Sequence, residues 1–300
     1  MKTNWIAVDW GTTNFRAFLM RHDAPLAELH QPCGLLSVEH QRFAATLQTL
    51  LAPWLQAYGA LPIVMAGMVG SQQGWFDVPY APLPAGMDDL LARLFAFTTP
   101  WGSPAWIVPG INGRSHYGLP DVMRGEEVQL LGLHALQPTA EHDVLLPGTH
   151  CKHARMIKGE IVHFSTFMTG ELFSLLSQHS ILGRDLPAQQ DDDAAFLAGV
   201  RTASLGAPFS HLIFSARTRR LAGELPEPYI HSYLSGLTIG YELLALTPGQ
   251  HVWVIGSPAL TTRYRMAGRQ MCLELHPVEG NLCFIRGLSE LFLRLQGATS

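Results

Sequence analysis

The sequence predicts an α/β protein of two lobes, each with a mixed sheet flanked by helices and both sharing a duplicated β-β-β-α core. A Gly-Thr turn stands between two apolar, strand-like runs at the start of the chain, and another stands between two such runs about halfway along. Each pair of runs is followed by a third strand and then by a helix, so the order of elements repeats. We therefore expect an N-terminal lobe of residues 1–140 and a C-terminal lobe of residues 141–300.

Composition supports a folded protein and excludes several classes of partner. The 300 residues are 47% hydrophobic and 15% charged, which is apolar enough to bury a sizeable core. The net charge of −4 shows no basic excess, so nucleic acid is not an expected partner. Apolar stretches end well short of a membrane span and no signal region opens the chain, which favours a cytoplasmic protein. The four cysteines lack paired spacing and are expected to be reduced thiols.

In the first half of the chain, the strongest signal is a helix. Phe43 is followed by apolar residues at offsets of 4, 7, 8, 11 and 12, which form one face of a helical period. Residues 78–86 are rich in proline and keep apolar side chains, which predicts a surface excursion. The other predicted elements are strands at 5–8, 15–20, 26–30, 61–66 and 105–108 and a helix at 125–136.

The second half repeats this order around its own Gly-Thr turn. Three consecutive acids, Asp191 to Asp193, are expected to begin a helix, where negative charge suits the N-terminal dipole. The helix predicted at 232–246 contains Gly236 and Gly240, whose spacing favours close packing on one face. The other predicted elements are strands at 144–146, 154–157, 161–164, 252–255 and near 282–285 and helices at 170–179 and 288–295.

The first turn, Asp9-Trp10-Gly11-Thr12-Thr13-Asn14, has the residue types of a phosphate-binding loop. A tip without bulky side chains lets backbone N–H groups approach phosphate oxygens, and Thr and Asn side chains add donors. Asp9 ends a buried strand, where its carboxylate is placed to hold Mg²⁺ beside a substrate phosphate. From these residues alone, a hairpin that uses Asp and Asn only for turn geometry is an equal alternative. Two such turns in two lobes favour a phosphoryl-transfer enzyme.

His150, Cys151 and His153 invite a zinc interpretation, which the spacing disfavours. Zinc sites separate their first two ligands by two or more residues and supply a second pair elsewhere. The second Gly-Thr turn meets neither condition. These residues are better explained as parts of a loop and strand.

Three motifs in order resemble those of the actin-like ATPase superfamily. The first turn resembles its first phosphate loop, residues 147–152 (PGTHCK) resemble its second, and residues 256–260 (GSPAL) resemble its adenosine motif. The resemblance implies a two-lobed actin-like ATPase (ribonuclease H-like) fold with ATP bound. The residues it implies for nucleotide binding are Gly11, Thr12, Thr13, Asn14, Gly148, Thr149, His150, Lys152, Gly256 and Ser257. Taken by itself, Lys152 is equally a solvated strand residue.

Four segments narrow the resemblance to the 2-dehydro-3-deoxygalactonokinase family. They are residues 6–16 (IAVDWGTTNFR), 66–75 (AGMVGSQQGW), 122–127 (VMRGEE) and 146–150 (LPGTH). This resemblance implies transfer of the ATP γ-phosphoryl group to O6 of 2-dehydro-3-deoxy-D-galactonate, with Mg²⁺, in galactonate catabolism. A homodimer is a further family expectation.

The resemblance also indicates a catalytic base. In related sugar kinases a Gly-Asp-Gln element opens the last helix of the first lobe, and here Glu126 falls on the Asp position. Phosphoryl transfer to a hydroxyl needs one such carboxylate near the acceptor oxygen. We predict Glu126 as the base, with Asp121 and Glu127 as alternatives, although two glutamates also simply favour a helix N-terminus.

A sugar acid carries a carboxylate, which a planar guanidinium binds through two hydrogen bonds. Arg16, Arg114 and Arg124 are the candidates for this contact, and each is otherwise a surface arginine. Loops that follow strand ends commonly reach a ligand. On that ground the further candidates for substrate binding are Met68, Gly70, Ser71, Gln72 and Asn112.

Two other functions remain open from the sequence. A kinase for another sugar or sugar acid, such as 2-dehydro-3-deoxy-D-gluconate, is the nearer alternative, and a non-catalytic nucleotide-dependent regulator is the more distant one. Phosphoryl transfer must exclude water, so we also expect closure of the lobes. We predict its hinge at residues 137–142, where Gln137-Pro138-Thr139-Ala140 breaks the helix pattern.

Overall fold

A six-stranded sheet forms around the first Gly-Thr turn. The computed structural model describes residues 4–39 and 42–298. Strand β1 pairs antiparallel with β2 and parallel with β4, and β4 pairs parallel with β7. The strand order is β3 (Ala24–Gln31), β2 (Phe15–Arg21), β1 (Asn4–Trp10), β4 (Ile63–Gly67), β7 (Pro104–Ile107), β6 (Phe95–Thr98).

A five-stranded sheet forms around the second Gly-Thr turn and repeats this arrangement. Strand β13 lies between β10 and β14 and pairs parallel with both. The strand order is β12 (Glu160–Phe167), β11 (Cys151–Ile157), β10 (Glu141–Leu146), β13 (His251–Gly256), β14 (Glu274–Glu279). The first five strands of the earlier sheet follow the same order, so the predicted duplicated core is confirmed.

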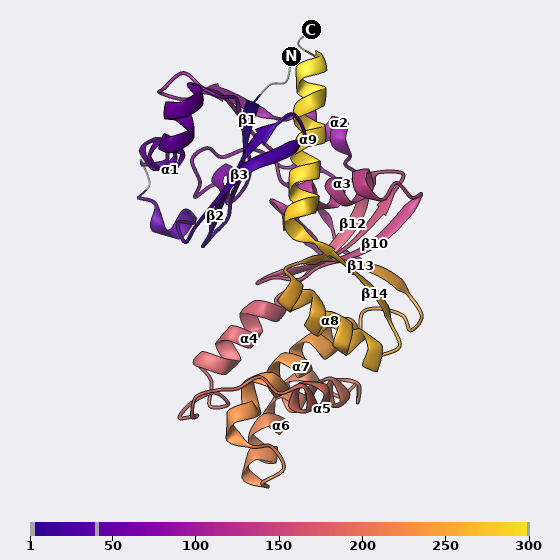
Figure 1. The fold of residues 1–300 in the computed structure, drawn as a ribbon. Coiled ribbons are helices and arrows are strands. Elements are labelled where there is room, and N and C mark those ends of the chain that lie inside the picture. Colours follow the sequence, from indigo (N-terminus) through magenta and orange to yellow (C-terminus); the bar gives the residue numbers. More distant parts are fainter. Residues whose placement is uncertain (1–3, 40–41, 299–300) are drawn as a thin grey trace. The chain divides into compact units, whose positions relative to one another are not determined.

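Alternation along β1 and β2 sends side chains to two different helical layers. Ile6, Val8 and Trp10 belong to the core cluster that also contains Leu47 and Leu51 of helix α1 (Phe43–Tyr58). On the other face, the ring of Trp5 stacks on Phe292 of helix α9 (Gly280–Ala298) at 4.4 Å between centroids. This period of two explains why α1 and α9 lie on opposite sides of the sheet in Figure 1.

Helix α9 crosses helix α3 (Glu126–Leu136) at very short range, because each helix has a glycine that lies against the backbone of the other. A Cβ atom on Gly132 would lie 1.8 Å from the carbonyl oxygen of Cys283, and one on Gly287 would lie 2.1 Å from that of Val128. Neither position can hold a side chain unless the helices separate. The crossing therefore fixes α3, whose first residues are the predicted base and its neighbour.

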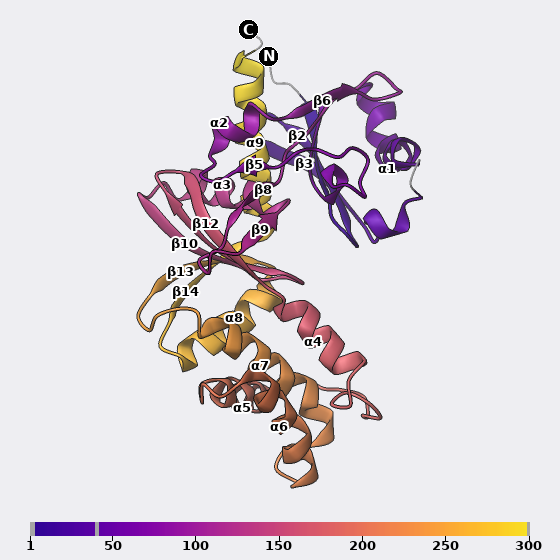
Figure 2. The ribbon, with the colours of Figure 1, turned by 180° about the vertical axis from the view of Figure 1, so that it is seen from behind.

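Residues 78–86 are more than the predicted surface excursion. They contain β5 (Ala81–Pro82), which joins β8 (Ile111–Arg114) and β9 (Pro120–Met123) in a three-stranded sheet visible in Figure 2. Val78, Ala81 and Ala85 are at most 1% exposed, so the segment contributes to the core. The short elements nearby are η1 (Leu35–Ser37), η2 (Met68–Gly70) and α2 (Met87–Leu91).

A helical cluster lies between β12 and β13 in the chain. Its members are α4 (Thr169–Gln178), α5 (Asp193–Ala203), α6 (Phe209–Leu221), η3 (Glu227–Tyr229) and α7 (Ile230–Leu243), and α8 (Pro258–Gln270) follows β13. A Cβ atom on Gly236 of α7 would lie 1.9 Å from the carbonyl oxygen of Phe196 on α5. The predicted close packing at Gly236 is confirmed. Asp192 accepts a hydrogen bond from the backbone N–H of Ala195 at 2.6 Å, so the predicted acidic helix start is also confirmed.

The strand predicted near 282–285 is wrong. These residues lie inside α9, which begins at Gly280, and the last strand is β14 instead. A short apolar run fits either a strand or one turn of a buried helix, and here the run continues a helical stripe that faces β1 and α3. The sequence of β14 contains Pro277 and two glutamates, which conceal a strand at the edge of the sheet.

Contacts divide the chain into two compact units that differ from the predicted lobes. The first unit holds the residues up to His142, Ala154–Ser165 and the residues from Gly280 on; the second holds Asp143–His153 and Thr166–Glu279. The chain therefore passes between units at four places, of which only the one after His142 adjoins the predicted segment 137–142. Helix α9 belongs to the first unit because it packs on β1 and α3. Over the described residues, no helix is long and apolar enough to cross a membrane.

Candidate active site

The first Gly-Thr loop is held from one side and exposes polar side chains on its tip. The carbonyl oxygens of Gly11, Thr12 and Thr13 accept hydrogen bonds from the backbone N–H groups of residues 35, 36 and 34 at 2.9, 3.1 and 3.0 Å. A Cβ atom on Gly34 would lie 2.3 Å from the carbonyl carbon of Thr13, so only glycine fits there. The side chains of Thr12, Thr13 and Asn14 are exposed. Sequence reasoning missed the supporting segment, for which Gly34 is the only local signal.

Asp9 and Arg16 face each other across the β1–β2 hairpin. Arg16 Nε donates to Asp9 Oδ2 at 3.0 Å, Nη2 makes a second contact with the same oxygen, and Nη1 donates to Asn281 Oδ1 at the start of α9. The three guanidinium nitrogens are thus engaged within the first unit. This arrangement favours a role for Arg16 in orienting Asp9 rather than in binding the carboxylate of a substrate.

Two glycines bring the end of β1, the end of β4 and the start of α3 together. Gly67 and Gly125 have φ angles of 94° and 110°, which side-chain-bearing residues rarely adopt. A Cβ atom on Gly67 would lie 3.2 Å from Asp9 Oδ1, and one on Gly125 would lie 3.3 Å from the Cα atom of Gly67. Because β1 and β4 are parallel, their carboxyl ends meet at this edge, where ligands commonly bind in α/β sheets.

Glu126 and Glu127 occupy different environments at the start of α3. Glu126 is half-buried, and its Oε2 accepts a hydrogen bond from the backbone N–H of Arg124 at 3.1 Å. Glu127 is fully buried, and its Oε2 accepts from the N–H of Gly125 at 2.6 Å. Burial, with a further contribution from the charge of Glu126, raises the pKa of Glu127 to about 8. Glu127 therefore keeps its proton at neutral pH, which makes it a poor base there.

Asp121, the other alternative for the base, lies in a separate small sheet. It pairs with Gly113 in the β8–β9 hairpin, and its Oδ1 accepts a hydrogen bond from the N–H of Val122 at 2.8 Å. Glu126 instead begins the helix whose N-terminus adjoins Gly67 and, through it, Asp9.

Arg124 is a buried guanidinium beside the loop at residues 68–72. Its Nη2 donates to the carbonyl oxygen of Val78 at 2.7 Å, and the group lies 4.3 Å from the ring centre of Tyr80. A Cβ atom on Gly70 would lie 2.9 Å from Arg124 Nη1. Among the described residues, Arg124 Nε and Nη1 and the hydroxyl of Ser71 are buried without a hydrogen-bond partner. Unpaired buried donors are costly, so this place calls for an acceptor.

The other predicted substrate residues are distributed over two elements. Met68 is half-buried on η2, and Gln72 is exposed just after it. Asn112 and Arg114 are exposed on β8, where Arg114 Nη1 donates to the carbonyl oxygen of Gly118 at 2.6 Å. The structure thus places Gly70 beside Arg124 and leaves Arg114 with the turn of its own hairpin.

The second Gly-Thr loop, in the second unit, rests on the start of α4. A Cβ atom on Gly170 would lie 2.3 Å from the carbonyl oxygen of Gly148, and the N–H of Glu171 donates to the carbonyl of Thr149 at 3.0 Å. His150 contacts the Glu171 carboxylate through Nε2. Gly148, Thr149 and His150 are exposed. The loop is therefore fixed by its carbonyls, as the first one is.

Lys152 is buried rather than solvated. It is 5% exposed, and its Nζ donates to Thr166 Oγ1 on the neighbouring strand β12 at 2.9 Å. His150, Cys151 and His153 each take a different partner: Glu171, Tyr264 and Glu242. The described part of the chain contains no cluster of three or more His, Cys, Asp or Glu side chains arranged for a metal ion.

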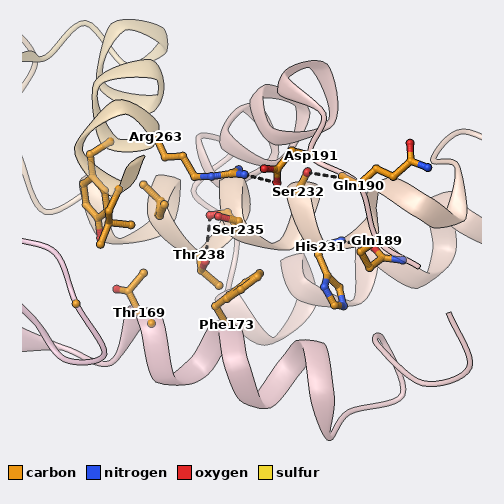
Figure 3. Close-up of a pocket in the computed structure, with 15 residues that line it drawn as sticks. Thr169, Phe173, Gln189, Gln190, Asp191, His231, Ser232, Ser235, Thr238 and Arg263 are labelled. Atoms are coloured by element: carbon orange, nitrogen blue, oxygen red, sulfur yellow. Dashed lines mark hydrogen bonds and ion pairs between the residues drawn. The ribbon is translucent and has the colours of Figure 1, made fainter. Parts of the chain in front are cut away.

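The same unit contains a cavity of about 510 Å³ next to the second loop. Such a volume lies within the usual range of small-molecule and cofactor sites. In Figure 3, Thr169 and Phe173 of α4 point toward Ser235 and Thr238 of α7, and Arg263 reaches Asp191. The lining residues are Gly148, Thr169, Gly170, Phe173, Gln189, Gln190, Asp191, His231, Ser232, Ser235, Thr238, Ile239, Leu260, Arg263 and Tyr264.

The predicted adenosine motif borders this cavity. Ser257 directly precedes α8, and Leu260 of the motif lines the cavity. A Cβ atom on Gly256 would lie 3.9 Å from Pro147 Cδ, so this turn and the second loop are neighbours. Arg263 Nη2 contacts Asp191 Oδ1 at 2.5 Å. Sequence reasoning missed Asp191 and Arg263 as cavity residues, because they are 72 positions apart and only the fold joins them.

Comparisons with known proteins point to one family over nearly the whole chain. The model of the family described as 2-keto-3-deoxy-galactonokinase matches residues 9–291. The chain is 35% identical over 295 residues to 2-dehydro-3-deoxygalactonokinase of Escherichia coli K12, covering 97% of this chain and 98% of the relative.

Solved structures agree on the fold. A crystal structure of a Sinorhizobium meliloti protein assigned as a 2-dehydro-3-deoxygalactonokinase has a TM-score of 0.86 and 35% identity, covering 97% of this chain and 96% of that one. The activator of 2-hydroxyisocaproyl-CoA dehydratase from Clostridium difficile, with bound ADPNP, has a TM-score of 0.53 and 10% identity, covering 99% and 97%. The second likeness concerns the fold alone. Together with the repeated strand order, these structures confirm the predicted actin-like ATPase fold.

Proposed function

The chain belongs to the 2-keto-3-deoxy-galactonokinase family, and on this premise we propose that it transfers the γ-phosphoryl group of ATP to O6 of 2-dehydro-3-deoxy-D-galactonate. The products are ADP and 2-dehydro-3-deoxy-6-phospho-D-galactonate, in galactonate catabolism. The observation that carries the site assignment is the meeting of Asp9, Gly67 and the start of α3 in the first unit. This meeting supports the proposal, in which Asp9 holds the cation and Glu126 accepts the proton of the acceptor.

Glu126 is the proposed base. It accepts the proton of the 6-hydroxyl while that oxygen forms a bond to the γ-phosphorus, and the bond from this phosphorus to the β–γ bridging oxygen breaks as ADP leaves. Its half-buried position and its backbone hydrogen bond from Arg124 orient the carboxylate, while the neighbouring Glu127 is buried and protonated. Charge stabilisation and positioning supply the rest of the catalysis.

Arg124 and Ser71 are proposed to bind the carboxylate of the sugar acid. The guanidinium is already fixed by Val78 and Tyr80, and its remaining donors have no partner among the described residues. A carboxylate that accepts from a fixed guanidinium satisfies both donors at once. Met68, Gly70, Gln72, Asn112 and Arg114 are proposed to shape the remainder of the acceptor site.

Asp9 is proposed to hold the Mg²⁺ that accompanies ATP. The residues fit such an ion, since Oδ2 is oriented by Arg16 and one carboxylate together with phosphate oxygens and water is a common magnesium site. When bound, the cation neutralises charge that develops on the phosphoryl group. The exposed donors of residues 12–14 are proposed to bind phosphate oxygens.

The second unit is proposed to bind the nucleotide in its cavity. Gly148, Thr149, His150 and Lys152 are assigned to the phosphates, and Gly256 and Ser257 to the adenosine. The support is that Gly148 lines the cavity and that Gly256 adjoins Pro147. We also propose a cytoplasmic homodimer, for which sedimentation gives a direct test.

The test is release of ADP by the purified protein with MgATP and one of three acceptors: 2-dehydro-3-deoxy-D-galactonate, its gluconate epimer or galactose. We expect strong turnover with the galactonate compound alone. Faster turnover with the gluconate epimer would overturn the substrate assignment but would still support a sugar-acid kinase. Turnover with galactose would contradict the carboxylate contact, and no acceptor-dependent turnover would overturn the proposed function.

A further inference from the structure

Glu242 is a buried carboxylate that joins three elements of the second unit. Its side chain is 1% exposed on α7. The hydroxyl of Tyr264, on α8, donates to Oε2 at 2.8 Å, and His153 Nε2, on β11, lies 2.9 Å from Oε1. A buried carboxylate is costly unless its oxygens are paired, so these two partners are necessary to it.

The contacts continue from Tyr264 to the second Gly-Thr loop. The tyrosine hydroxyl lies 3.2 Å from Cys151 Sγ, and that sulfur lies 3.4 Å from both the backbone nitrogen and the carbonyl oxygen of Gly148. Gly148 and Tyr264 both line the cavity. An unbroken series of polar contacts therefore links a carboxylate outside the cavity lining to the backbone of the loop.

Both intermediate groups remain neutral at physiological pH. Burial, followed by the charge of Glu242, raises the pKa of the Cys151 thiol to about 12 and holds that of Tyr264 well above its usual range. The thiol is therefore a hydrogen-bonding group rather than a nucleophile. The charged groups that face this series are the Glu242 carboxylate and, when protonated, His153.

We propose that Glu242 is a positioning residue for ATP, which acts through Tyr264 and Cys151 to hold the loop at Gly148 in its binding conformation. The inference rests on the proposed nucleotide site of the second unit. The position of the loop is set by α4 on one side, through Gly170 and Glu171. On the other side, Cys151 at the start of β11 accepts a hydrogen bond from the backbone N–H of Gly148 in the loop. Loss of the Tyr264 hydroxyl would release that support while leaving the α4 contacts intact.

The experiment compares Tyr264→Phe and Glu242→Gln with a matched control, Tyr233→Phe. Tyr233 is also a fully buried tyrosine of this unit, its hydroxyl donates to Thr202 Oγ1 at 2.9 Å, and it does not line the cavity. Calorimetry measures MgATP binding without acceptor, and steady-state kinetics measures KM for ATP, KM for the sugar acid, and kcat. Thermal unfolding records the stability of each variant.

We expect Tyr264→Phe to weaken MgATP binding about tenfold, the effect of one hydrogen bond, with KM for the sugar acid unchanged. Tyr233→Phe should lower the melting temperature about as much as Tyr264→Phe does, but it should leave MgATP binding unchanged. Glu242→Gln should behave as Tyr264→Phe; if it does not fold, Tyr264→Phe alone decides. Equal MgATP binding by wild type and Tyr264→Phe would overturn the inference. A wild-type protein that binds no MgATP would overturn the proposed nucleotide site itself.

Discussion

Glu126 and Glu127 stand side by side at the start of α3 and accept hydrogen bonds from two consecutive backbone N–H groups, those of Arg124 and Gly125. Only Glu127 is fully buried. The same local motif therefore produces two acids with different chemistry, because the helix turns one inward and leaves the other half-buried. Their environments, rather than their side chains, distinguish the proposed base from its neighbour.

Glu127→Gln is expected to flatten the dependence of stability on pH. The folded pKa of about 8 lies above the usual value, so the native state holds a proton that the unfolded state has released. The free energy of unfolding of the wild type should therefore fall as pH rises from about 5 to about 8, by up to ~1.4 kcal/mol per unit. Glutamine cannot titrate and removes this contribution. Urea unfolding across that range measures it, and parallel curves for the two proteins would refute the assignment.

Arg124→Lys is expected to weaken binding of the sugar acid selectively. Lysine keeps the charge but cannot present two parallel donors or stack on Tyr80 in the same way. KM for the acceptor should rise by about 10- to 100-fold, the range of hydrogen bonds to charged groups. KM for ATP should stay constant. Arg93→Lys is the control, because Arg93 is exposed and its Nη1 donates to the carbonyl oxygen of Asp89 at 3.4 Å. An unchanged KM for the acceptor in Arg124→Lys would contradict the carboxylate contact of Arg124 and leave Arg114 as the candidate.

Gly34→Ala is expected to damage the first Gly-Thr loop from behind. The new methyl group would lie 2.3 Å from the carbonyl carbon of Thr13, so the segment must move away and lose its hydrogen bonds to the loop. We expect a loss of about 1–3 kcal/mol in stability and a higher KM for ATP. Gly297→Ala, where no atom lies within 4 Å of the added methyl, is the matched control. If Gly34→Ala kept the ATP affinity of the wild type, the segment at Gly34 would not be needed for the first Gly-Thr loop to bind ATP.

The features that could be predicted from the sequence are those that depend on residues close together in the chain. The period of α1, the two Gly-Thr hairpins, the acidic start of α5 and the small residues of α7 each follow from spacing or residue type within one segment. The duplicated β-β-β-α core was also predicted, because the order of elements repeats along the chain.

Features that depend on distant contacts could not be predicted in this way. The run at 282–285 became helical because α9 packs on both β1 and α3. Arg16 lies beside Asp9 only through strand register, and Asp191 meets Arg263 only through tertiary packing. Burial likewise separates Glu126 from Glu127 and hides Lys152, although all three are ordinary charged residues in the sequence.

The most direct test of this account is the rate of acceptor-dependent ADP release by wild type, Glu126→Gln and Glu127→Gln, measured side by side with MgATP and 2-dehydro-3-deoxy-D-galactonate. We predict that Glu126→Gln lowers kcat by about 10²–10⁴-fold, the usual contribution of a general base, while KM for ATP is little changed. Glu127→Gln should retain most of the wild-type rate near neutral pH, because glutamine resembles the protonated acid. A Glu126→Gln variant that turns over at the wild-type rate, with Glu127→Gln inactive, would contradict the assignment of the base.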